Sequence, residues 1–90
     1  MEIEYDPRKR EKTLKHRGLD FKQCTKVFNA PHIDIEDNRV DYGEERIITF
    51  GFLGSHEVVI VWTQRGEKRR IISMRKANER EQQTFYKHLG

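Results

Sequence analysis

The stretch Arg69-Arg70-Ile71-Ile72-Ser73-Met74-Arg75-Lys76-Ala77 places cationic side chains on both sides of an apolar core. Neighbouring isoleucines favour a β-strand, because branched side chains fit a pleated surface. Guanidinium groups suit phosphate, since they offer paired planar donors and stay charged at physiological pH. The stretch therefore predicts a strand with arginines beside it, in a protein that acts on or binds a phosphate-rich polymer.

Two apolar runs upstream predict the rest of a sheet. Arg46–Leu53 and Glu57–Thr63 are rich in Ile, Val and aromatic residues, and Gly54-Ser55 between them indicates a hairpin. The segment 58–62 is apolar on both faces, which is typical of a central strand. Arg65-Gly66-Glu67 then turns the chain into the last strand.

Helix signals flank these strands. Asp6-Pro7 predicts the start of a basic helix that runs to Arg17, with Leu14 as its clearest apolar anchor. A second helix is expected over residues 20–29, where Phe21, Cys24 and Phe28 fall at helical spacing. Asn78 and Glu81 resemble a capping box that opens a final helix towards residue 88.

The predicted order is β-α-α-(β)-β-β-β-α. It includes a short strand at residues 2–6 and a strand plus polar loop within residues 32–42. We expect an α+β fold, an antiparallel meander with N-terminal helices and one C-terminal helix packed on one face of the sheet. Ninety residues predict a single domain, spanning residues 1–90.

Charge is distributed in patches. The net charge is only +3, but residues 8–17 and 68–76 are strongly basic, whereas acids gather between residues 34 and 45. Such patches favour binding to a nucleic acid or to an acidic partner. The single cysteine, Cys24, excludes an internal disulfide and reads as a small buried hydrophobe. No signal peptide or membrane-length apolar run is present, so we expect a cytoplasmic protein without a membrane role.

Metal and cofactor signals are weak. His32, Asp34 and Glu36 share one face of a strand and could ligate a metal, but the rest of a metal site is missing. A polar outward face is the favoured interpretation. The sequence contains no Walker loop, nucleophile elbow or dinucleotide fingerprint. We therefore predict no metal and no cofactor.

Arg70 and Arg75 are the first candidate site residues. On a regular strand two residues five apart face opposite sides, so these two share a site only if a bulge intervenes or Arg75 lies beyond the strand end. The alternative is that Arg69 and Arg70 are solvated charges that protect an edge strand. Lys9 and His16 on the basic helix are weaker candidates, because a lone histidine is more often a surface or structural residue.

Several segments together resemble the BrnT family of type II toxins. They are Tyr5-Asp6-Pro7-x-Lys9, Lys15-His16 with Gly18 and Phe21, Val27-Phe28, Glu45-Arg46, and Arg70-Ile71-Ile72-Ser73-x-Arg75-Lys76-Ala77 followed by Glu81. The resemblance implies a ribonuclease toxin with a RelE-like fold that reduces translation and growth. It also implies a cognate BrnA antitoxin, a ribbon-helix-helix DNA-binding protein, in a hetero-oligomer that represses its own operon through operator DNA.

The resemblance, with the basic patches, gives a set of candidate site residues. The expected catalytic residues are Arg75, Arg70, Lys9 and His16, and the expected RNA-binding residues are Arg46, Arg69, Lys76 and Lys15. The chain departs from the family pattern at three places: Arg17 follows the histidine, Met74 replaces a small residue, and Phe85 with Tyr86 stands where a tyrosine is common.

The sequence thus predicts a metal-independent endoribonuclease toxin acting on RNA. Such cleavage needs no protein nucleophile, because the RNA 2′-OH attacks and positioned cations stabilise the charged phosphorane. Two alternatives remain open. One is a non-catalytic module that binds nucleic acid through the same patches. The other is a protein-interaction subunit whose basic face meets an acidic partner.

Overall fold

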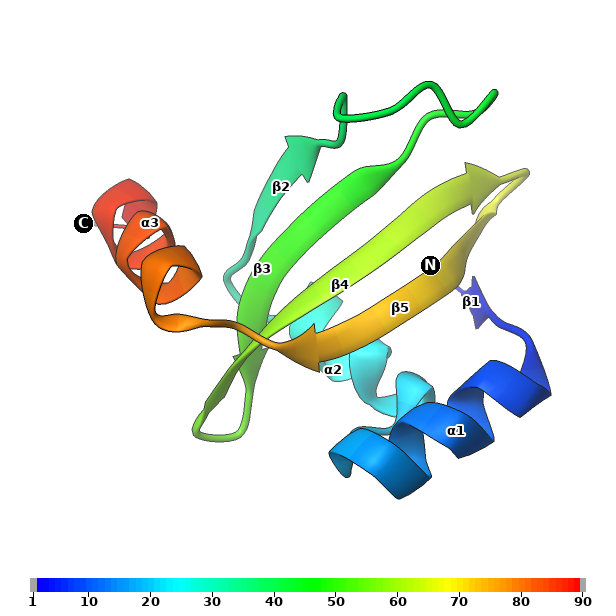
Figure 1. The fold of residues 1–90 in the computed structure, drawn as a ribbon, viewed down its shortest axis with the longest axis horizontal. Helices are drawn as coiled ribbons and strands as arrows, with labels where there is room; N and C mark the ends of the chain where they lie inside the picture. Colours follow the sequence, from blue (N-terminus) through cyan, green and yellow to red (C-terminus); the bar gives the residue numbers. More distant parts are fainter. Residues whose placement is uncertain (1, 90) are drawn as a thin grey trace.

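The computed structural model describes residues 2–89, with the backbone alone for Leu89, and these residues form a five-stranded sheet (Figure 1). The strand order is β1-β5-β4-β3-β2. The strands are β1 (Ile3–Glu4), β2 (Ile33–Glu36), β3 (Ile47–Leu53), β4 (His56–Arg65) and β5 (Lys68–Lys76). Strands β2 to β5 form the predicted antiparallel meander, with β4 in the centre, and β1 adds a short parallel edge beside β5.

The helices are α1 (Pro7–Arg17), the 3₁₀ helix η1 (Phe21–Gln23), α2 (Cys24–Phe28) and α3 (Glu79–Leu89). The element order and the α+β class are confirmed. The single helix expected over residues 20–29 is wrong, because a 3₁₀ turn comes before a short α-helix. The Asp20 side chain accepts a hydrogen bond from Lys22 N, and Gln23 N donates to Asp20 O, so the first turn is tightened.

The helices lie on both faces of the sheet, so the expectation of one helical face is wrong. On one face Val58, Ile60 and Trp62 of β4 pack in a cluster with residues of η1 and α2. On the other face Val59 packs with Phe85 of α3. Because successive strand residues point to opposite faces, β4 is apolar on both sides. Figure 1 shows α3 at one end of the sheet, apart from α1 and α2. We call the first the helical face and the second the α3 face.

Polar contacts hold α1 in place, not the apolar anchor that the sequence indicated. Leu14 is 41% exposed, and α1 contains no buried residue. Instead Arg10 Nε and Nη2 donate to the two carboxylate oxygens of Asp20 at 2.8 and 3.0 Å. Arg17 Nη1 donates to Met74 O at 3.0 Å, which joins α1 to β5. The predicted Asp6 cap is confirmed, since its side chain accepts from Arg8 N.

Two small residues mark close packing in the core of the helical face. Cys24 is fully buried with Sγ 3.7 Å from Met74 Sδ, and burial raises the pKa of its thiol to about 12. The prediction of a buried hydrophobe is therefore confirmed. Gly51 of β3 lies so close to Val27 that an added Cβ would overlap Val27 Cγ1. No helix among the described residues is both long and apolar enough to cross a membrane.

Candidate nucleic-acid interface

A β-bulge in β5 brings the two candidate arginines to the same face. Val61 pairs with Ser73 and Trp62 pairs with Ile71, so Ile72 is an extra residue in the ladder. The extra residue shifts the alternation of side chains by one position, so residues five apart in the sequence point to the same side. Arg70 and Arg75 therefore both point to the α3 face. The bulge that the sequence argument required is therefore present.

Three arginines then belong to one face, and we call Arg46, Arg70 and Arg75 the sheet-face cluster. Arg70 pairs with Thr63, which alternates with the buried Trp62. Continuing the β3–β4 register places Arg46 opposite the same threonine. The cluster therefore lies on both sides of β4, with Arg46 just before β3 and the other two arginines on the rigid backbone of β5.

Arg75 makes the tightest contact of the cluster. Its Nη1 and Nη2 donate to the two carboxylate oxygens of Glu81 at 2.6 and 2.7 Å, and its side chain is 39% exposed. The hydrogen bond from Arg75 lowers the pKa of Glu81, and the same bond raises the pKa of Arg75. The sequence placed Glu81 in a capping box, which is confirmed, but gave no signal that it also binds Arg75.

Arg46 is held by a ring and a carboxylate. Its guanidinium carbon lies 3.7 Å from the centre of the Tyr42 ring, and its Nε lies 3.6 Å from Glu44 Oε1. That separation allows charge attraction but is too long for a hydrogen bond. The Nε atom is buried and has no hydrogen-bond partner. Arg46 therefore has a local ion pair with Glu44, and one of its donors is unsatisfied.

The other candidate cations line a groove between α1 and β5, which we call the α1–β5 groove. It has a cavity volume of about 290 Å³. Its lining residues are Lys9, Lys12, Thr13, His16, Arg17, Phe21, Ile72 and Ser73. Lys9, Lys12 and His16 form no ion pair with another described residue. Ser73 also belongs to the α3 face by register, so the groove adjoins the sheet-face cluster.

The remaining expected RNA-binding residues lie outside both places. The Arg69 guanidinium packs over the rings of Phe28 and Trp62, 4.1 and 4.7 Å from their centres, on the helical face. Lys76 pairs with Val58 and so points away from the α3 face. Lys15 is exposed on α1 but does not line the groove. The structure thus separates these three from Arg70 and Arg75.

Two groove residues were missed as candidates. Lys12 and Arg17 share the groove with Lys9 and His16. Lys12, His16 and Arg17 follow Lys9 by three, seven and eight residues, and this spacing is the signal that places the four on one side of a helix. The sequence alone could have grouped them, but it could not show that this side meets β5.

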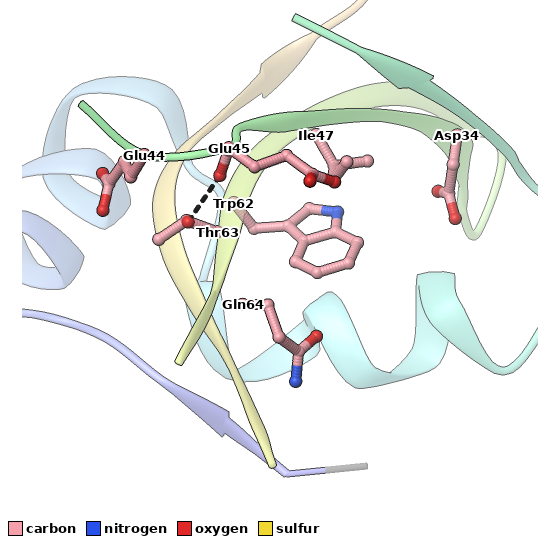
Figure 2. Close-up of a pocket in the computed structure, with 7 residues that line it drawn as sticks. All are labelled: Asp34, Glu44, Glu45, Ile47, Trp62, Thr63 and Gln64. Atoms are coloured by element: carbon pink, nitrogen blue, oxygen red, sulfur yellow. Dashed lines mark hydrogen bonds between the residues drawn. The ribbon is translucent and has the colours of Figure 1, made fainter. Parts of the chain in front are cut away.

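A second cavity, of about 470 Å³, does not suit a phosphate. Figure 2 shows the Trp62 indole at its centre with the carboxylates of Asp34 and Glu45 nearby. Glu44, Ile47, Thr63 and Gln64 complete the lining, and Thr63 Oγ1 donates to Glu45 O at 2.6 Å. Three carboxylates repel a polyanion, so this larger cavity is not the site for RNA.

The weak metal hypothesis gains no support from the geometry. His32 Nε2 lies 3.8 Å from Asp34 Oδ2, and Asp34 Oδ1 accepts a hydrogen bond from Thr49 at 2.6 Å. Within residues 2–89, no group of three or more His, Cys, Asp or Glu side chains is arranged to hold a metal ion.

The aromatic pair of α3 is divided between two roles. Phe85 is 2% exposed and packs edge-to-face on Phe52, with ring centres 5.1 Å apart. Tyr86 is 51% exposed, and its hydroxyl donates to Glu57 Oε1 at 2.6 Å. That hydrogen bond raises the pKa of Tyr86. Phe85 therefore attaches α3 to the sheet, and the Tyr86 hydroxyl is already engaged on β4.

Fold and site together define a small α+β protein with a cationic face and groove suited to a phosphate-rich ligand. A sequence profile described as "Ribonuclease toxin, BrnT, of type II toxin-antitoxin system" matches residues 5–81. The chain belongs to this family, which confirms the resemblance seen in the sequence, and membership implies an antitoxin partner. A comparison with curated proteins found no match.

Proposed function

We propose that this protein is a metal-independent endoribonuclease that cleaves cellular RNA and so inhibits translation and growth in the cytoplasm. Family membership supports the ribonuclease class. The observation that carries the proposal is the β5 bulge, because it aligns Arg70 with Arg75 beside the α1–β5 groove. The partner that neutralises it is a BrnA-type ribbon-helix-helix antitoxin, and the complex reaches operator DNA through that antitoxin.

In the proposed mechanism the substrate supplies its own nucleophile. Arg75 and Arg70 hold the scissile phosphate, and their charge stabilises the phosphorane that forms when the 2′-OH attacks. His16 or Lys9 transfers a proton or makes a further phosphate contact from the groove. The leaving 5′-oxygen takes up the proton, and the product carries a cyclic phosphate. Arg46 binds the RNA backbone on the same face.

Induced expression in a bacterium tests this function. Wild type should arrest growth and degrade total RNA, whereas Arg75→Ala at equal soluble level should do neither. The purified protein should cleave RNA equally with and without EDTA, and an RNA with 2′-O-methyl riboses should stay intact. Folded wild type that binds RNA without cleaving it would contradict the proposal, as would cleavage that EDTA abolishes.

A further inference from the structure

Glu81 joins the start of α3 to the most constrained arginine of the sheet-face cluster. Its Oε1 accepts from Arg75 Nη1 at 2.6 Å and from Asn78 N at 2.9 Å, and its Oε2 accepts from Arg75 Nη2 at 2.7 Å. In return, Asn78 Oδ1 accepts from Glu81 N at 2.9 Å. One carboxylate therefore closes the capping box of α3 and binds Arg75 at the same time.

The hydrogen bonds of Arg75 leave one edge of its guanidinium free. A guanidinium carries five N–H donors in a fixed plane. Two of them bond to Glu81, and Nη1 also lies 3.4 Å from Lys76 O. Nε and the second N–H of Nη2 have no acceptor among the described residues, and they lie on the same edge. Two parallel donors of this kind fit two oxygens of one phosphate.

The geometry points to Glu81 as a positioning residue that holds Arg75 from one side so that its free edge binds an RNA phosphate. This inference rests on the proposed function. An unheld arginine must lose its side-chain freedom when it binds. An arginine fixed in advance loses less, and so binds phosphate more tightly.

Glu81 can hold Arg75 because α3 itself is fixed. Phe85, one helical turn beyond Glu81, is 2% exposed and packs against Phe50 and Val59 of the sheet. The hydrogen bond from Arg75 lowers the pKa of Glu81, so the carboxylate stays charged at neutral pH. The Arg75 side chain is 39% exposed, and its Nε is not among the buried side-chain atoms without a partner, so this edge is open to solvent.

The opposite role would be masking, in which Glu81 competes with phosphate for Arg75. The two roles differ in sign. If Glu81 positions Arg75, Glu81→Gln weakens RNA binding. If Glu81 masks Arg75, the same substitution strengthens RNA binding, because a neutral amide competes less than a carboxylate.

The test measures binding of a labelled single-stranded RNA with 2′-O-methyl riboses by fluorescence anisotropy, and cleavage of the unmodified RNA. Glu81→Gln should weaken binding about tenfold or more, as expected when hydrogen bonds between charged groups are lost. Glutamine keeps an oxygen that can accept from Asn78 N, so α3 should remain capped. Glu79→Gln is the matched control, since it removes the same charge from an exposed position of the same helix turn.

A double-mutant cycle with Arg75→Ala separates positioning from a general structural effect. It is run at low ionic strength, where weak binding stays measurable. Glu81→Gln should leave RNA binding almost unchanged when Arg75 is already alanine. Arg75→Lys should lose as much as Glu81→Gln, because an ammonium cannot bind a carboxylate and present a second planar edge.

Three results would overturn the inference while leaving the proposed function intact in a wild type that cleaves RNA. The first is unchanged or tighter RNA binding by Glu81→Gln. The second is an equal loss of RNA binding when Glu81→Gln is added to Arg75→Ala. The third is wild-type RNA binding by Arg75→Lys. A folded wild type that neither binds nor cleaves RNA would instead overturn both proposals.

Discussion

RNA binding by this protein should depend steeply on salt, and two lysines of the α1–β5 groove should account for about half of that dependence. Lys9, Lys12 and Arg17 line the groove, and Arg70 lies on the α3 face, all without an ion pair to a described residue. Arg46 and Arg75 also contact RNA in the proposed mechanism, but each already faces a carboxylate, so its contact adds little to the release of counterions and is not counted.

The expected magnitude follows from counterion release. Each cation that contacts a single strand contributes about −0.7 to the slope of log K against log salt, so four contacts give about −3. Raising salt from about 50 to about 200 mM should then weaken binding roughly 50-fold. Replacing Lys9 and Lys12 together by glutamine should halve the slope to about −1.4 and reduce the loss to about sevenfold.

The assay is an anisotropy titration with the 2′-O-methyl RNA at several salt concentrations. The matched control is Arg65→Gln with Lys68→Gln, which removes two charges at the β4–β5 turn. These two residues are already paired with acids, Arg65 with Glu44 at 3.6 Å and Lys68 with Glu2 at 3.7 Å. A groove variant with the wild-type slope, or a control variant that lowers the slope equally, would refute the assignment of RNA contacts to the groove.

Three further results are expected. Gly51→Ala should destabilise the protein by about 1–3 kcal/mol in urea unfolding, because the new methyl group overlaps Val27, and adding Val27→Ala should recover part of the loss. Tyr86→Phe should leave RNA cleavage unchanged in a gel assay, because its hydroxyl already donates to a glutamate on β4. Arg10 lowers the pKa of Asp20 from 3.8 to about 2, so this carboxylate stabilises the fold above pH 3.8 and the contribution is lost as pH falls towards 2. Urea unfolding across that range should therefore show a smaller acid loss for Asp20→Asn than for wild type.

Local sequence signals predicted the elements that depend on near neighbours. The apolar run at residues 58–62 gave the central strand, and Asn78 with Glu81 gave the start of α3, because both depend on contacts within a few residues. The candidate arginines were also found from sequence, but only as a conditional prediction. Arg70 and Arg75 could share a face if a bulge lay between them, and nothing in Ile71-Ile72 identified the bulged residue.

Long-range contacts explain what the sequence did not predict. Leu14 was the clearest apolar anchor in its segment, yet α1 is held by Arg10 on Asp20 and by Arg17 on β5. The face that α3 covers is set by the side chains of β3 and β4 that point to it, and these strands are distant from α3 in the sequence. The groove likewise forms only when α1 meets β5. Each of these depends on residues distant in the chain, which propensity and periodicity do not report.

The bulge itself leads to a last prediction, that Ile72 can be deleted while the α3 face keeps its arginines. Without Ile72, Arg75 lies four positions after Arg70 on a regular strand, so both still point to the α3 face. Ile71 and Met74 also keep their places on the helical face, because the deleted residue has no partner in β4. We therefore expect a folded protein, destabilised by less than about 3 kcal/mol, that still binds RNA.

The control is deletion of Ile60, which lies in the ladder of β4 and pairs on both sides. Removing it shifts the register by one residue and turns the following apolar side chains to the wrong face. That variant should not fold. Circular dichroism and urea unfolding distinguish the two deletions. If deleting Ile72 unfolds the protein as deleting Ile60 does, this prediction is wrong. The bulge would then be needed to bend β5 towards α1, in addition to keeping the alternation of side chains.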